Sequence, residues 1–178
     1  MLNDPSRPLY RSCQIMEFPS FGPEFTDWIV ARFKTVGIEC ARDAIDHLRT
    51  LVQDTPNYVQ MVCFHMVALA KTTVNTKDVE EVLNTVARQN AYTYQTLLNS
   101  LTPAQQRALR LAANERHSLF QKDLLDKYEI TNAPALHSSI KALKTKGILD
   151  EEGTAKGKVM FDDPLFAFWL RMSWGCGP

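Results

Sequence analysis

Several features that would point to a function class are missing from the sequence. Its four cysteines are far apart and form no CxxC pair, which argues against a zinc site or a disulfide framework and favours a reducing, cytoplasmic setting. The longest apolar run, Met61 to Ala70, is far shorter than the roughly 18 residues of a membrane-spanning helix. The 20 Lys and Arg residues balance 20 Asp and Glu, so no overall field draws the chain to nucleic acid or to an anionic membrane. We therefore expect a cytoplasmic protein without a membrane partner.

Catalytic motifs are also missing. No GxxxxGK[ST] phosphate loop, no apolar strand ending in paired acids and no GxSxG elbow occurs. His47, His65, His117 and His137 share no spacing typical of a metal site, and Cys63 lies two positions from His65, so that on a helix the two side chains diverge. We expect no catalytic residue, no metal and no cofactor in this chain, which by itself should not hydrolyse a nucleotide.

The first hundred residues have the apolar periodicity of helices. FGPEFTDWIVARFKTVG predicts one helix, with Pro23 near its start and Gly37 as its stop, and CARDAIDHLRTLVQ predicts a second. A third begins sharply at Pro56, and a fourth follows an N-cap at Thr76. Because the third is apolar on nearly all sides, we expect it to be the buried centre of a small bundle.

A different order of elements begins at Leu101. One helix starts at Pro103, a shorter one at Ser118, and Thr131 or Asn132 caps a third. ILDEE and KVMFDD then predict two strands joined by the turn-rich GTAKG, and a last helix follows from Pro164. Three helices followed by a β-hairpin are typical of a winged helix-turn-helix domain.

These elements predict a mainly α fold in three segments. Residues 1–22 lead into the fold, 23–100 form a small helical bundle, and 101–178 form a winged helix domain with a β-hairpin wing. The last helix has an aromatic face that we expect to dock on the winged helix or on its neighbour domain. Any part left exposed would offer Phe166 and Trp169 to a protein partner or to a second copy.

The third helix of the winged segment is a candidate double-stranded DNA contact, because its polar side chains could reach phosphates or base edges and the wing could touch the flanking backbone. The candidate residues are His137, Ser138, Lys141 and Lys144 on the helix, and Lys156 and Lys158 on the wing. Ordinary solvated lysines would give the same pattern, and acidic residues flank the wing. A stand-alone DNA-binding regulator and a protein-interaction adaptor therefore both remain open.

Five segments, in order and spacing, resemble the carboxy-terminal part of a group of prokaryotic AAA+/STAND-type ATPases. They are SRPLYRSCQIMEFPSF, EFTDWIVARF, TPNYVQMVC, SSIKALKTKGIL and DDPLFAFWLR, and they extend from Arg7 to about Arg171. In that family a P-loop core is followed by a helical lid and a winged helix. The resemblance implies a regulatory fragment of a larger ATPase, or a shortened relative that has lost its core. It further implies that ATP with Mg binds between that missing core and the lid.

The same resemblance gives the turn before Pro56 a role. In the family, a glycine-x-proline corner of the lid comes close to the nucleotide and senses it, and lid closure moves the winged helix and so alters its DNA or protein contacts. Pro56 and Thr55 stand at this corner, while Asp54 occupies the glycine position. A residue with a Cβ cannot take every glycine conformation, and a carboxylate is unfavourable near phosphates. The alternative is that Pro56 only starts a helix.

Overall fold

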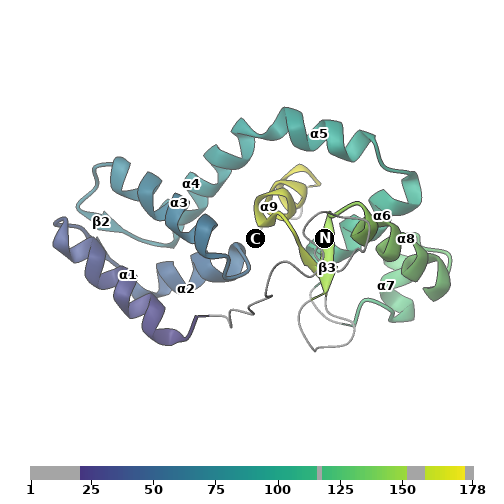
Figure 1. Cartoon of the computed structure of the whole chain (residues 1–178), viewed down its shortest axis with the longest axis horizontal. Coiled ribbons are helices and arrows are strands. Elements are labelled where there is room, and N and C mark those ends of the chain that lie inside the picture. The colour runs from purple at the N-terminus through teal and green to yellow at the C-terminus, as the bar shows by residue number, and fades with distance from the viewer. Residues whose placement is uncertain (1–20, 116–117, 152–158, 175–178) are drawn as a thin grey trace, which may run out of the picture.

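The computed structural model describes residues 21–115, 118–151 and 159–174. Figure 1 shows two groups of helices, joined by α5 across the top, with α9 between them. The first group has four helices and two short strands that pair in parallel, with Glu39 opposite Thr73. Its elements are α1 (Pro23–Thr35), β1 (Glu39–Cys40), α2 (Arg42–Leu51), α3 (Pro56–Ala68), β2 (Thr73–Val74) and α4 (Thr76–Gln89).

The second group has the predicted order of three helices and a hairpin. Its elements are α6 (Pro103–Asn114), α7 (Lys122–Lys127), α8 (Ala133–Thr145), β3 (Leu149–Glu151) and β4 (Val159–Phe161). The helix α5 (Ala91–Asn99) leads into this group, and α9 (Pro164–Ser173) follows it. The strands β3 and β4 are antiparallel, with Leu149 opposite Phe161. The predicted fold class, mainly α with a helical bundle followed by a winged helix, is confirmed.

Most helix ends lie where sequence chemistry places them. Pro23, Pro56, Pro103 and Pro164 each stand in the first turn of a helix, where proline's fixed φ is already helical and its missing N–H would have no partner. After α1, Gly37 has a φ of 76°, the left-handed conformation expected of a helix stop.

Two predicted helix starts were wrong. The N-cap of α4 is Asn75, not Thr76, because Asn75 accepts a hydrogen bond from the Lys77 N–H while the Asp78 carboxylate accepts one from the Asn75 N–H. The helix α7 begins at Lys122 rather than at Ser118, whose φ of 58° is incompatible with a right-handed helix.

The central helix of the first group is α4, which packs against α2, α3 and α9. The expectation that α3 is the buried centre was wrong. Only Val59, Val62 and Met66 of α3 are buried, whereas Phe64 is 71% exposed. The all-round apolar sequence of α3 does not show which face is covered, and only one face meets α4.

The helix α9 lies between the two groups and contacts α4, α5, α6 and β4. All residues from Pro164 to Leu170 are buried. Full burial of one large apolar side chain is worth about 1.5–3 kcal/mol, so this helix supplies much of the attraction between the groups. The expected docking of its aromatic face is confirmed, on both neighbours at once.

The expected partner surface at Phe166 and Trp169 was wrong, because these side chains are only 2% and 7% exposed. Their rings pack on Tyr94 of α5, with centroids 5.2 and 5.7 Å from the Tyr94 ring. Both aromatic residues therefore belong to the interior.

Candidate functional site

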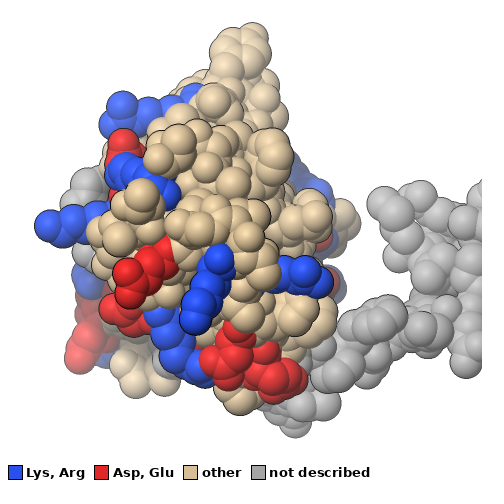
Figure 2. Space-filling view, turned by 90° about the vertical axis from the view of Figure 1, so that its left-hand side faces the viewer, with Lys and Arg blue, Asp and Glu red and all other residues tan. Residues whose placement is uncertain are grey.

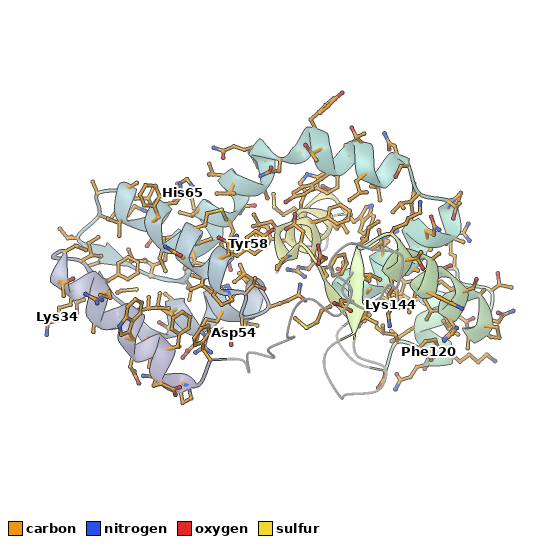
Figure 3. The ribbon with its side chains drawn as sticks, viewed as in Figure 1. Lys34, Asp54, Tyr58, His65, Phe120 and Lys144 are labelled. Atoms are coloured by element: carbon orange, nitrogen blue, oxygen red, sulfur yellow. The ribbon has the colours of Figure 1, made fainter. Side chains whose placement is uncertain are left out.

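The turn between α2 and α3, residues 53–56, is called the corner below. Gln53 and Asp54 both have a φ of 53°, the left-handed region that non-glycine residues rarely adopt. The Asp54 N–H donates to the Arg49 carbonyl at 2.7 Å, and the Thr55 N–H donates to the Val52 carbonyl at 3.0 Å. These bonds fold the chain back on the end of α2 before Pro56 starts α3. Figure 3 shows Asp54 and Tyr58 on the side of α2 and α3 nearer the hairpin.

Arg49 holds the corner against the start of α1. Its Nε and Nη2 donate to the two carboxylate oxygens of Asp54 at 2.7 and 2.8 Å, a bidentate pair that is mostly shielded from water. Its Nη1 donates to the Gly22 carbonyl and to the Thr26 hydroxyl, both at 3.0 Å. The hydrogen bond with Asp54 raises the pKa of Arg49. The Asp54 charge is therefore compensated inside the corner.

The two site residues inferred from the resemblance sit on the outer side of this corner. Thr55 is half-buried and its side chain makes no capping hydrogen bond to α3, while Pro56 is exposed. The structure thus leaves Pro56 open to a neighbouring group.

A second set of contacts joins the corner to the wing, and sequence reasoning did not identify it. The Phe161 N–H of β4 donates to the Gln53 side-chain oxygen at 3.1 Å. The Tyr94 hydroxyl donates to Asp163 Oδ2 at 2.8 Å, while Asp163 Oδ1 accepts the Leu165 N–H at 2.9 Å and so caps α9. Asp before Pro is a recognisable cap signal, but nothing in the sequence links these residues to one another.

The Asp163 carboxylate also affects Tyr58, two residues after Pro56. Burial, together with a hydrogen bond to the Asp163 carboxylate, raises the pKa of Tyr58 to about 12. The same causes raise the pKa of Tyr94 further above its usual range. Both tyrosines are therefore neutral hydrogen-bond donors at any physiological pH.

The DNA-contact candidates fall into three groups. His137, Ser138 and Lys141 are exposed together on α8. Lys144 is half-buried in the last turn of the same helix. Lys156 and Lys158 lie outside the described residues.

Charge does not concentrate at the far end of the first group. Figure 2 shows basic and acidic side chains intermixed on this face, around an uncharged area. Arg42, for example, pairs with both Asp27 and Asp46. This end of the described chain has no basic surface of the kind that binds phosphates.

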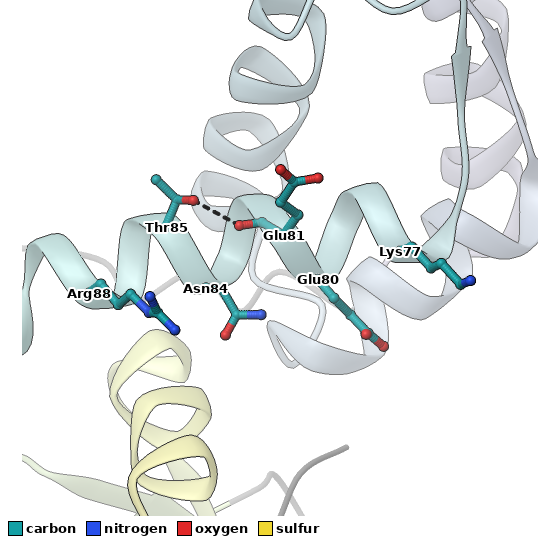
Figure 4. A pocket seen from close by; sticks show the side chains of 6 residues that line it. All are labelled: Lys77, Glu80, Glu81, Asn84, Thr85 and Arg88. Carbon is teal, nitrogen blue, oxygen red and sulfur yellow. Dashed lines mark hydrogen bonds between the residues drawn. The ribbon is translucent and has the colours of Figure 1, made fainter.

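A hollow of about 430 Å³ lies away from the corner. Its lining consists of Lys77, Glu80, Glu81, Asn84, Thr85 and Arg88. All six belong to α4, and Figure 4 shows them on both sides of that helix, as on an open surface. The described residues contain no group of His, Cys, Asp and Glu that could hold a metal, and no helix among them is long and apolar enough to cross a membrane.

Comparison with known proteins matches the second group of elements to a family. Residues 92–172 match the family model described as "Probable winged helix domain". No curated protein sequence matches the chain.

Among solved structures, the chain is similar to the Walker-type ATPase of Pyrococcus abyssi, with a TM-score of 0.60 and 19% sequence identity. The likeness covers 96% of this chain and 48% of that one, so the chain spans about half the length of its structural relative. At this identity the likeness shows a shared fold. The chain thus has a mainly α fold whose residues 92–172 match a winged helix family model, and the whole is similar in fold to about half of a Walker-type ATPase.

Proposed function

We propose that this chain is the carboxy-terminal regulatory region of a nucleotide-dependent ATPase of the AAA+/STAND type. In this proposal α1–α4 form the lid, and the winged helix responds to it. The shared fold with half of a Walker-type ATPase and the winged helix match support this order of domains. A P-loop core outside these residues would bind ATP with Mg, and Thr55 and Pro56 would face that nucleotide.

The observation that carries the proposal is the backbone of Asp54. This residue stands at the family's glycine position and has a φ of 53°, which glycine adopts without strain. The backbone of the corner therefore has the conformation that a glycine at position 54 would readily adopt. The Arg49 pair compensates the carboxylate, which weakens the electrostatic objection to a nearby phosphate.

The first test is the size of the native protein, by immunoblotting cells of its source. A band well above the 20.2 kDa of this chain is expected, because the proposal requires a core domain. A band at 20.2 kDa would contradict the presence of such a core.

The second test is binding of a fluorescent ATP analogue to the native-length protein. Pro56→Ala loosens the corner and should weaken binding by about two- to fivefold. Pro103→Ala is the matched control, since Pro103 is also exposed at the start of a helix. Asp54→Gly should preserve binding, because glycine accepts the same φ. If the Pro56 and Pro103 variants bind the ATP analogue with equal affinity, the corner is not part of the nucleotide site.

A second candidate function is DNA binding, favoured by the joint exposure of His137, Ser138 and Lys141 on α8. Binding to duplex DNA should then weaken with salt, and Lys141→Ala should lower the log–log salt slope by about one. Lys34→Ala, on the exposed end of α1, is the control. No duplex binding at low salt would exclude this function.

A further inference from the structure

The wing strand β4 has a backbone donor that its own hairpin does not satisfy. The Asp162 N–H donates to the Ile148 carbonyl, toward β3. Successive N–H groups of a strand point to opposite sides, so the Phe161 N–H points away from β3, at the open edge of a two-stranded sheet. Its partner is the Gln53 oxygen, 3.1 Å away. Because Phe161 is 6% exposed, water is a poor substitute for that partner.

Gln53 reaches this position because of its backbone. With φ at 53° it belongs to the two-residue left-handed turn of the corner. A change of that φ would turn the side chain relative to β4 and break the bond. The wing therefore has a contact whose geometry depends on the conformation of the corner.

A second contact lies beside the first. Asp163, two residues after Phe161, caps α9 and accepts a hydrogen bond from the Tyr94 hydroxyl of α5. The short segment from Phe161 to Asp163 is thus bound to Gln53 of the corner at one end and to Tyr94 of α5 at the other.

We propose that the hydrogen bond between Gln53 and Phe161 forms a latch that ties the wing to the corner, so that a change of corner conformation releases β4 from the first group of helices. The inference rests on the proposed function in one respect, which is that nucleotide binding would cause the change of corner conformation. The latch itself is a property of this chain.

The test is amide hydrogen exchange, followed by NMR on the whole chain without nucleotide. The main variant is Gln53→Asn, which shortens the side chain by one methylene and keeps a residue type that tolerates the left-handed conformation. Phe161 should exchange about fivefold faster, as expected for the loss of one hydrogen bond. Asp162 should change less, because its N–H donates within the hairpin.

Gln60→Ala is the matched control, since Gln60 is exposed on α3, and it should leave Phe161 unchanged. Unchanged exchange at Phe161 in folded Gln53→Asn would overturn the latch. Absence of ATP binding by the native-length protein would instead overturn the proposed function and leave the latch standing.

Discussion

The Tyr94 hydroxyl lies 2.8 Å from the Asp163 carboxylate, although the two residues are 69 positions apart in the chain. This bond connects α5 to the start of α9, at the point where the two groups of helices meet. A neutral phenol donating to a carboxylate makes a strong hydrogen bond, and here Tyr94 is buried while Asp163 is half-buried.

Replacing Tyr94 by Phe removes this hydrogen bond and keeps the ring that packs on Phe166 and Trp169. We expect the free energy of unfolding to fall by about 1.5–3 kcal/mol, the range for hydrogen bonds to charged groups. Urea denaturation measures the loss. Tyr92→Phe is the control, because Tyr92 is 86% exposed and should change stability by less than about 0.5 kcal/mol.

The pair of Arg49 with Asp54 predicts a specific need for arginine. Lysine cannot supply the planar fork that reaches both carboxylate oxygens, so Arg49→Lys should destabilise the chain by about 2 kcal/mol. Arg88→Lys, on the exposed face of α4, should be nearly neutral under the same urea titration. Equal effects of the two replacements would show that the pair contributes only charge.

Asp78 predicts a loss of stability in acid. The hydrogen bond from Lys71, followed by that from the Asn75 N–H, lowers the pKa of this carboxyl. A carboxyl with a lower pKa in the folded state stabilises the fold above its unfolded pKa of about 3.9, and this contribution disappears as the pH falls through the folded value. Unfolding measured from pH 7 to 3 should therefore show a smaller acid loss in Asp78→Asn. Asp123→Asn, on the surface of α7, should retain the wild-type slope.

The placement of α3 predicts opposite outcomes for two of its apolar residues. Met66 is fully buried, so Met66→Ala should cost about 2–5 kcal/mol of stability. Phe64 is 71% exposed, and Phe64→Ala should change stability by less than about 0.5 kcal/mol. Thermal unfolding of the two variants is sufficient. A large loss of stability in Phe64→Ala would show that α3 is the buried centre of the bundle after all.

Elements that local sequence encodes were predictable, and relations between distant elements were not. Apolar periodicity and the positions of prolines predicted the helices. The two extended segments after Gly147 predicted the wing. The burial of α3 failed because composition does not tell which side of an apolar helix has a neighbour. The contact of Gln53 with Phe161 could not be foreseen, since a glutamine in a turn is ordinary until the fold brings an unpaired backbone donor to it.

The position of α9 also sets the order in which the protein can become stable during synthesis. Both groups of helices pack against α9. Its residues nevertheless leave the ribosome after those of every other described element. Until then α4, α5 and α6 expose the apolar faces that α9 will cover. These exposed faces make the nascent chain prone to aggregation, so it depends on protection by chaperones. Completion of the fold is therefore a late event that closes both groups together.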